Sequence, residues 1–284
     1  MILLPGALPT LASAGVAALA LPWLLWLPSL AAMVAYGAAI ALPDSAARTV
    51  RSALAVGWLA QAAAIFVDIA GIGSDVTGAR FGFAPALSAT VWMVVSVYAL
   101  ESRELPQGAV RRALAGCAAA VVLLASIFPG QFRPHGGSPW APVHWVLGLA
   151  SYGLFGAAVL HALLQSAGER RMRSKTVPAS GETGVPLLRL ERLTFRFVAA
   201  GFFLLTAAIA FGWWVLPGAR WDHKTVFSLL AWGVFAGLLA GRTAFGWRGR
   251  RATRWLYVGA GLLLLGYAGS RFVLEVVLRR VAGA

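Results

Sequence analysis

Long apolar runs separated by short polar breaks dominate the pattern of this 284-residue chain. Each run is close to the roughly 20 residues that a helix needs to cross a bilayer. Helices are expected because backbone N–H and C=O groups in lipid must be satisfied within each segment. The pattern predicts an all-α, polytopic transmembrane helical bundle of about eight spans, at residues 22–42, 52–71, 83–100, 113–128, 144–165, 195–216, 225–241 and 255–277.

Two stretches depart from this pattern. Residues 129–142 are rich in proline and glycine, so no regular helix is expected there. Residues 1–27 are apolar but lack the positively charged start of a secretory signal peptide. We interpret them as a hydrophobic leader, and the sequence leaves open whether they form an additional membrane segment. Residues 28–284 are then expected to form one transmembrane domain.

Composition and charge favour lipid as the main solvent of this chain. Hydrophobic residues make up 60% and charged residues 12%, which is more apolar surface than a soluble domain can hide. The net charge of +14 lies mainly in the breaks between apolar runs. Lys and Arg number 17 in the breaks after spans one, three, five and seven, against 6 on the other side. The positive-inside rule predicts that the heavier side is cytoplasmic and that both termini lie outside.

Several functional classes are disfavoured by what the sequence lacks. The basic breaks contain few aromatic residues and are typical of topology signals, so we expect the lipid bilayer as a partner and no nucleic acid. The single cysteine, Cys117, allows neither a disulfide within the chain nor a haem attachment motif of the Cys-x-x-Cys-His type. No set of acid–base or nucleophilic residues converges, so an enzymatic role is disfavoured and no catalytic residue is assigned.

The polar break Trp221-Asp-His-Lys-Thr225 and the start of the fifth span at His144 fall on the same predicted outer side. Three of the four histidines of the chain gather on that side. Imidazole is a natural axial ligand of haem iron, and tryptophan rings can form the walls of a flat apolar slot. The alternative is an interfacial belt of tryptophans with a histidine that caps a helix. The residues alone leave both interpretations open.

The remaining histidine, His161, is expected to lie elsewhere. It follows His144 by 17 residues, which is roughly 25 Å along a helix. That distance is close to the thickness of the membrane. We therefore expect His161 to partner a polar group near the cytoplasmic end of its span.

Charged residues within the predicted spans are expensive in lipid, so each is expected to be paired or functional. Arg271 and Glu275 stand four residues apart and share one helical face. They are either a self-compensating pair near the outer interface, or Arg271 holds an anionic group such as a haem propionate. Asp68, near the outer end of the second span, is another candidate partner for Arg271 or for Arg80.

Several motifs together resemble a known family. His144-Trp-Val-Leu-Gly-Leu-Ala-Ser-Tyr-Gly-Leu-Phe155 is followed by Gly201-Phe-Phe-Leu-Leu-Thr206 and by Trp221-Asp-His-Lys-Thr225. Over roughly residues 50–278 the chain resembles the cytochrome c assembly superfamily of haem-handling membrane proteins, the CcsA/CcmC/ResC type. The closest similarity is to the YpjD-like branch. Three further stretches carry this similarity, namely Glu191-Arg-Leu193, Gly246-Trp-Arg-Gly-Arg250 and Gly269-Ser-Arg-Phe-Val-Leu-Glu275.

This resemblance implies haem handling at the outer face of the bacterial inner membrane during cytochrome c assembly, with other maturation proteins as partners. Haem-delivering members hold haem beside a tryptophan-rich loop that ends in Trp-Asp, flanked by two external histidines. Here the loop is shorter, His223 replaces a proline, and the second histidine before the end of the last span has no counterpart. The implied haem-binding residues are His144, His223, Trp214, Trp221, Asp222 and Arg271, with the two histidines as iron ligands.

The shortened loop also keeps a second hypothesis open. In it, the protein is a non-haem membrane accessory or transport-related protein that keeps the fold and has lost haem delivery. The polar residues of the outer side would then be structural, and Arg271 with Glu275 would line a path. An absorption spectrum of the purified protein distinguishes the two hypotheses.

Overall fold

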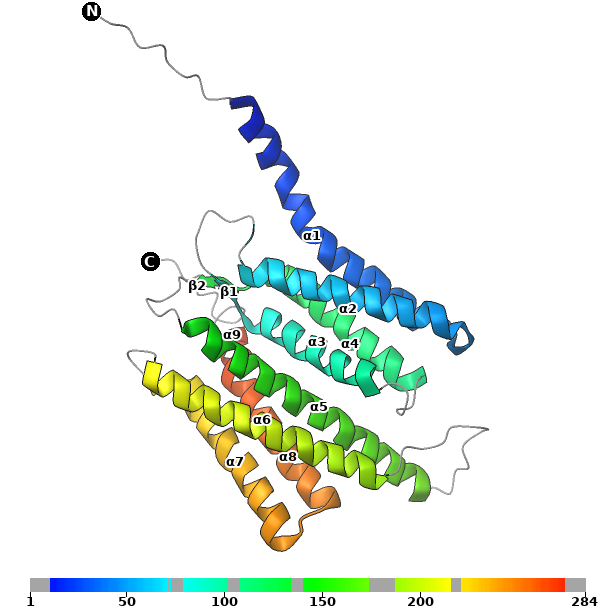
Figure 1. The fold of residues 1–284 in the computed structure, drawn as a ribbon, viewed down its shortest axis with the longest axis vertical. Helices are drawn as coiled ribbons and strands as arrows, with labels where there is room; N and C mark the ends of the chain where they lie inside the picture. Colours follow the sequence, from blue (N-terminus) through cyan, green and yellow to red (C-terminus); the bar gives the residue numbers. More distant parts are fainter. Residues whose placement is uncertain are drawn as a thin grey trace, which may run out of the picture.

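The computed structural model describes residues 11–70, 72, 79–101, 108–133, 140–173, 187–215 and 221–273. These residues form a helical bundle with one short β-ribbon (Figure 1). In chain order the elements are α1 (Leu11–Ala41), η1 (Asp44–Ala46), α2 (Ala47–Ala70), β1 (Ala79–Phe81), α3 (Phe83–Glu101), α4 (Gly108–Ile127), β2 (Gln131–Arg133), α5 (Ala141–Arg173), α6 (Leu187–Val215), α7 (His223–Phe245), α8 (Gly249–Leu264), the π-helical turn η2 (Leu265–Gly269) and α9 (Ser270–Phe272).

Helices α2 to α7 are each long and apolar enough to cross a membrane, which confirms six of the predicted spans. The other two predicted spans, residues 22–42 and 255–277, fall on α1 and on α8 with its continuation. The apolar stretch Leu25–Ala41 within α1 and the 16 residues of α8 are both shorter than these six helices. The all-α class is confirmed. The orientation of the bundle in the membrane stays a prediction, because length and composition alone identify the spans.

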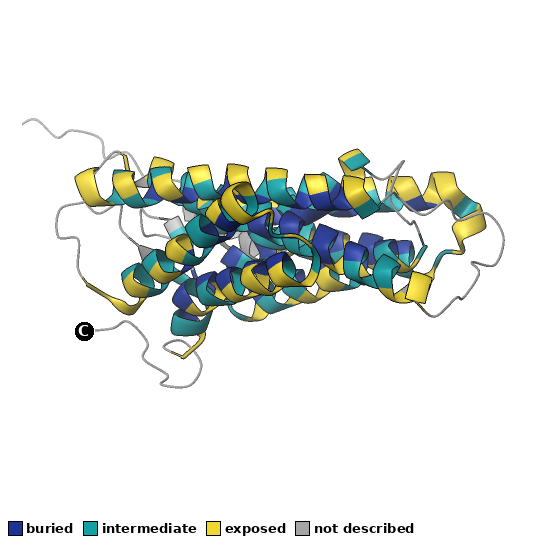
Figure 2. Ribbon diagram, turned by 90° about the horizontal axis from the view of Figure 1, so that it is seen from below, coloured by how far each residue is buried: buried dark blue, intermediate teal, exposed yellow. Residues whose placement is uncertain are grey.

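Two apolar cores lie side by side in the bundle. One is built from α1 to α4 around Tyr36 and Val122, and the other from α5 to α8 around Phe155 and Phe235. The rings of Phe155 and Phe235 stack with centroids 3.8 Å apart. Helix α3 packs against α2, α4 and α5, and so joins the two halves. The buried positions face inward, and exposed positions run along the outer faces (Figure 2). Those outer faces are apolar, as contact with lipid requires.

Close helix packing depends on small residues at the contacts. Helix α8 approaches α7 at Gly259, where an added Cβ would lie 2.7 Å from the Phe235 ring. Helix α2 approaches α1 in the same way at Gly57, where an added Cβ would lie 2.9 Å from the Tyr36 ring. The Tyr36 hydroxyl donates a hydrogen bond to Oε1 of Gln61 at 2.7 Å. The Gln61 side chain in turn donates to Ser88, so the polar side chains of Tyr36, Gln61 and Ser88 satisfy one another.

Several helices extend beyond their apolar runs. The fifth span was predicted to end near residue 165 and the sixth to begin near 195, whereas α5 continues to Arg173 and α6 begins at Leu187. The hydrophobic pattern detects only the part of a helix that lipid covers, and these extensions are basic. In the described part of residues 129–142, no long helix precedes the start of α5. Their strand β2 pairs antiparallel with β1, a ribbon that the sequence pattern did not predict.

The bundle has two chemically different ends. We call the end where α5 and α7 begin and α4 and α6 finish the histidine end, because it holds His144 and His223. The opposite end, where α5 finishes and α8 begins, is the arginine end, with Arg170, Arg242 and Arg248. The β-ribbon lies at the histidine end (Figure 1).

Candidate functional site

His144 lies in the first turns of α5 with its ring against α6. Its Nδ1 is 3.0 Å from the backbone carbonyl oxygen of Ala208. A carbonyl only accepts hydrogen bonds, so Nδ1 carries the proton and Nε2 keeps its lone pair. The ring fits because residue 212 is glycine: a Cβ there would lie 2.7 Å from Cε1 of His144. The ring is therefore fixed in the tautomer in which Nε2 can bind a metal ion.

The polar break before α7 is organised by Asp222. Its Oδ1 accepts hydrogen bonds from the backbone N–H and the hydroxyl of Thr225, both at 2.9 Å. This is a helix N-cap, which explains why α7 begins here. Partial burial raises the pKa of Asp222, but the two Thr225 hydrogen bonds and the charges of Lys224 and His223 outweigh it and lower that pKa below its ordinary value. Asp222 is thus a charged cap at the start of α7.

His223 is the first residue of α7 and is exposed. Among the described residues, no hydrogen bond or ring contact joins it to His144. The two histidines nevertheless flank the same part of the chain, the end of α8. Helix α5 reaches it through Tyr152, whose hydroxyl donates to the Leu263 carbonyl at 2.7 Å. Helix α7 reaches it at Gly266, where an added Cβ would lie 2.8 Å from Cβ of Phe227.

Arg271 lies at a depth similar to that of His144. Helices α5 and α8 run in opposite directions, and Tyr152 meets Leu263 between them. His144 precedes Tyr152 by eight residues and Arg271 follows Leu263 by eight, so both lie about 12 Å from that bond toward the histidine end. Arg271 is 4% exposed, and its buried Nε has no hydrogen-bond partner among the described residues, as is also true of Nε of Arg111 at the arginine end. A buried guanidinium nitrogen without a partner is costly and suits an anionic ligand.

The end of α8 contains a feature that the sequence pattern did not predict. Residues 265–269 form the π-helical turn η2, and such turns occur frequently at functional sites. Gly266 within it allows the close approach of α7 described above. The two glycines of the turn, Gly266 and Gly269, were the only sequence signal for it. The turn packs against α7 and α3 and lies directly before Arg271.

The tryptophans of the predicted site do not lie together. Trp221 packs edge-to-face against Trp213, with ring centroids 5.8 Å apart. Trp214 is 90% exposed, as expected of an interfacial aromatic residue. The pairing of Trp221 with Trp213 was missed by the sequence reasoning, which assigned Trp214 as the second wall. The role of either ring as a haem wall stays a prediction.

Interaction partners can be described for only some of the other charged residues of the predicted outer side. Asp68 interacts electrostatically with Arg80, which selects one of the two partners considered for it. Glu275, the expected partner of Arg271 on the same helical face, lies outside the described residues, as does His135.

His161 lies at the arginine end, as predicted, and is fully buried. Its Nε2 is 2.6 Å from Oε2 of Glu101, and its Nδ1 is 2.8 Å from the Ala157 carbonyl oxygen. Both ring nitrogens therefore have partners. The expectation that His161 partners a polar group near that end is confirmed, and the group is Glu101.

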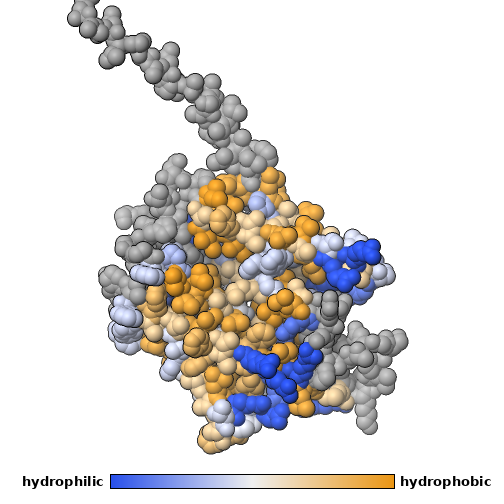
Figure 3. Space-filling view, in the orientation of Figure 1, coloured by the Kyte–Doolittle hydropathy of each residue, from blue (hydrophilic) through white to orange (hydrophobic). Residues whose placement is uncertain are grey.

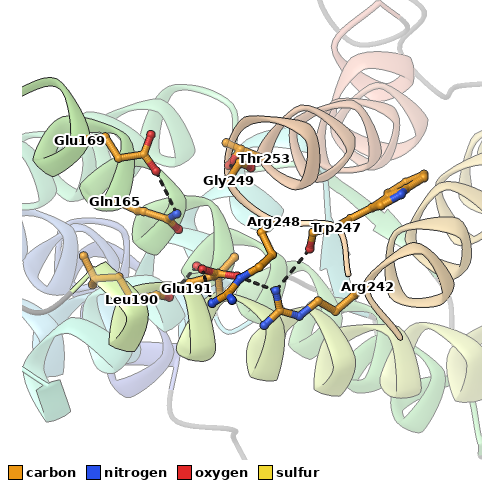
Figure 4. Close-up of polar contacts among 10 residues, drawn as sticks. Gln165, Glu169, Leu190, Glu191, Arg242, Trp247, Arg248, Gly249 and Thr253 are labelled. Atoms are coloured by element: carbon orange, nitrogen blue, oxygen red, sulfur yellow. Dashed lines mark hydrogen bonds and ion pairs between the residues drawn. The ribbon is translucent and has the colours of Figure 1, made fainter. Parts of the chain in front are cut away.

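A second polar cluster at the arginine end surrounds Glu191, which the sequence reasoning noted as part of a motif but gave no role. Its carboxylate accepts hydrogen bonds from Arg242 at 2.5 Å and from Nε of Arg248 at 2.8 Å (Figure 4). Arg242 also donates to the Trp247 carbonyl at 3.3 Å. These contacts join the start of α6 to the connection between α7 and α8. Glu191 is more than 50 residues from either arginine in sequence, so no local pattern predicted the cluster.

Comparison with known proteins identifies the family. Residues 50–278 match the family described as cytochrome C assembly protein. The chain belongs to the cytochrome c assembly protein family. The resemblance that the motifs carried is therefore confirmed.

Individual relatives match only part of this chain, with about one third of the aligned residues identical. The chain is 32% identical to the inner membrane protein YpjD of Escherichia coli K12 over 158 residues, 54% of this chain and 60% of YpjD. It is 33% identical to an uncharacterised 28.8 kDa protein of Azospirillum brasilense over 50% of this chain and 55% of that protein. It is 31% identical to the cytochrome c biogenesis protein CcsA of Synechococcus sp. JA-3-3Ab over 34% of this chain and 31% of CcsA.

These matches cover only part of each relative, about 60% of the length of YpjD. No solved structure matches the chain. The family and its membrane-embedded helices are thus shown, whereas the chemistry of this member must be argued from its own residues.

Proposed function

We propose that this protein binds haem at the histidine end and presents it, as cargo, for cytochrome c assembly. The observation that carries the proposal is the arrangement of His144. Its Nδ1 is held by the Ala208 carbonyl, and its ring is fixed against Gly212. A histidine held in this way offers Nε2 to iron, and backbone carbonyls commonly orient metal-binding histidines by the same contact.

The residues around His144 fit a haem in two respects. A neutral imidazole is an axial ligand of haem iron, and His144 supplies one. A haem also carries anionic propionates, and Arg271 offers a buried nitrogen without a hydrogen-bond partner at a similar depth. We assign His144 as the first iron ligand and Arg271 as the propionate partner. His223, at the start of the neighbouring helix α7, is the proposed second ligand.

The remaining predicted residues have supporting roles in this proposal. Asp222 caps α7 and so fixes the place of His223, which directly follows it. Trp221, packed on Trp213, offers an apolar ring face near the start of α7. Trp214 is proposed to contact haem only from the exposed side, because its side chain is 90% exposed. None of these groups acts on a bond, so the protein binds and presents haem without catalysis.

The location of this activity follows from charge and similarity. Lys and Arg favour the arginine end, which the positive-inside rule assigns to the cytoplasm. The histidine end then faces outward, where cytochromes c are assembled. The relative YpjD is described as an inner membrane protein, and we propose the same membrane for this chain. Other cytochrome c maturation proteins are the proposed partners that receive the haem.

An absorption spectrum tests the proposal. The full chain is purified from cells supplied with haem, together with His144→Ala, His223→Ala and, as a matched control, His161→Gln. The glutamine of the control keeps a side-chain amide donor at the arginine end and changes nothing at the histidine end. The proposal expects a Soret band in the wild type and the control, and its loss in His144→Ala. A folded wild-type protein without a Soret band contradicts the proposal and favours the non-haem accessory protein.

A further inference from the structure

A basic cleft lies between α5 and α8 at the arginine end, far from His144 and His223. Its volume is about 310 Å³. Four arginines line it, Arg170 and Arg173 from the end of α5 and Arg250 and Arg254 from the start of α8. We propose that this cleft binds the phosphate group of an anionic lipid. The proposal is independent of haem binding.

The charge of the cleft is not balanced by the protein. Glu169 is the only carboxylate in its lining, and its Oε1 accepts a hydrogen bond from Gln165 at 3.2 Å. Within the part of the chain that the structure describes, none of the four arginines forms an ion pair. Four guanidinium groups around one cleft repel one another, and a phosphate relieves this repulsion with charge-assisted hydrogen bonds.

The neighbouring Glu191 cluster differs from the cleft, because its arginines are paired with a carboxylate. There, one buried carboxylate binds two arginines, Arg242 and Arg248, through short hydrogen bonds (Figure 4). The arginines of that cluster are thus occupied by the fold itself. The four arginines of the cleft are exposed instead. The arginine end therefore has a neutralised cluster and a cleft with excess positive charge.

The position of the cleft favours a lipid over a free anion. Helix α5 has 33 residues, about 50 Å of helix, against a hydrocarbon layer of roughly 30 Å. Its last turns, with Arg170 and Arg173, therefore extend to the level of the lipid headgroups. Tyr257 lines the cleft on the membrane side, and Val258 beside it is 55% exposed. Acyl chains can lie against these apolar side chains while the arginines hold the phosphate.

The surface agrees with this arrangement. Figure 3 shows strongly hydrophilic side chains over the start of α8, directly beside apolar surface. A second hydrophilic area covers the turn between α1 and α2, which carries Arg48 and Arg51. The described lining of the cleft comes from α5 and α8, and neither Arg48 nor Arg51 belongs to it. Basic pockets between transmembrane helices on the cytoplasmic side are typical sites for anionic headgroups.

Calorimetric titration of the full chain in an uncharged detergent tests the proposal. The probes are a short-chain phosphatidylglycerol, the matching phosphatidylcholine and inorganic phosphate. The cleft variant is Arg170→Gln with Arg254→Gln. The control is Arg48→Gln with Arg51→Gln, which removes the same charge from exposed positions at the same end. Thermal unfolding of each variant verifies that it is folded.

We expect the wild type and the control to bind phosphatidylglycerol in preference to phosphatidylcholine. The cleft variant is expected to bind it at least about tenfold more weakly, because each arginine near a membrane surface contributes substantially to anionic lipid binding. Equal binding of the two lipids by the wild type would overturn the proposal without any variant. An equal loss in the control, or inorganic phosphate that competes as well as the lipid, would overturn it too.

Discussion

The two ends of the bundle use similar residues in different ways. At the arginine end, His161 has a partner at both ring nitrogens, and Glu191 binds two arginines. At the histidine end, His144 has one nitrogen bonded and His223 is exposed, while Arg271 is buried with Nε unbonded. Polar groups that complete the fold satisfy one another.

Arg111 at the arginine end also has a buried Nε without a partner among the described residues, but the Asp44 carboxylate and the Leu42 carbonyl hold Nη2 of its guanidinium. We expect a ligand to complete the polar groups that keep unused hydrogen-bonding capacity.

This comparison predicts that substitutions at the two ends have different effects. The largest expected effect is that of Glu191→Gln on stability. The Glu191 side chain is 9% exposed and holds two arginines, so loss of its charge leaves both without a counterion. We expect a loss of about 2 kcal/mol in the free energy of unfolding. This is less than the loss for a fully buried ion pair, because both arginines are partly exposed.

Thermal unfolding of the detergent-solubilised protein, followed by circular dichroism, measures this effect. Arg248→Gln is the matched control and should cost less, because the Arg248 side chain is 56% exposed. The haem spectrum of both variants is expected to be unchanged. Loss of the Soret band in Glu191→Gln would contradict the claim that the two ends have separate roles in stability and haem binding.

A slightly smaller effect is expected for His161→Leu. The substitution removes the partner of the Glu101 carboxylate at a fully buried position. Leaving a partly buried polar group without its partner costs about 1.5 kcal/mol. His161→Gln keeps a donor and is expected to cost less in the same unfolding experiment. Equal destabilisation by Leu and Gln would mean that packing, and not the hydrogen bond, is what His161 contributes.

At the histidine end, Gly212→Ala is expected to weaken haem binding. The new Cβ would lie 2.7 Å from Cε1 and 3.0 Å from Nδ1 of His144, which displaces the ring from the Ala208 carbonyl. Loss of such an orienting contact typically weakens metal binding about tenfold. Haem titration followed at the Soret wavelength measures the change. Gly148→Ala is the control, because an added Cβ there meets nothing within 4 Å.

The smallest expected effect is that of Asp222→Ala, which removes the N-cap of α7. Loss of a helix cap costs about 1 kcal/mol, and Asp222→Asn should retain most of this stabilisation. The pKa of Asp222 is below its ordinary value. Its contribution is therefore present at neutral pH and is lost as the pH falls through that lowered pKa. Unfolding of the Asp222→Ala variant should consequently depend less on pH in the acidic range.

The helices could be predicted from the sequence because lipid imposes a strong pattern of apolar runs. The end of α5 and the start of α6 could not, since those turns lie beyond the lipid and are basic. The place of His144 at the start of α5 followed from its position in the chain, and the separate role of His161 followed from its distance along one helix. The Ala208 contact of His144 spans 64 residues, and no local pattern encodes it.

The same limit applies to the polar clusters. Glu191 and Arg248 are 57 residues apart, and only the packing of α6 against the turn before α8 brings them together. The π-helical turn was equally hidden, because one inserted residue in an apolar helix does not change its hydrophobic pattern. Sequence reasoning thus proposed which residue types carry chemistry at the histidine end. It did not identify the contacts that orient them.

The spectrum of the His144 variant tests the central claim most directly. Full-length wild type, His144→Ala and His161→Gln are purified from cells supplied with haem, and their absorption is compared at equal concentrations of folded protein. The account predicts a Soret band in the wild type and in His161→Gln, and its loss in His144→Ala. A Soret band of equal height in His144→Ala, or a wild type that carries none, would contradict the assignment of the histidine end as a haem site.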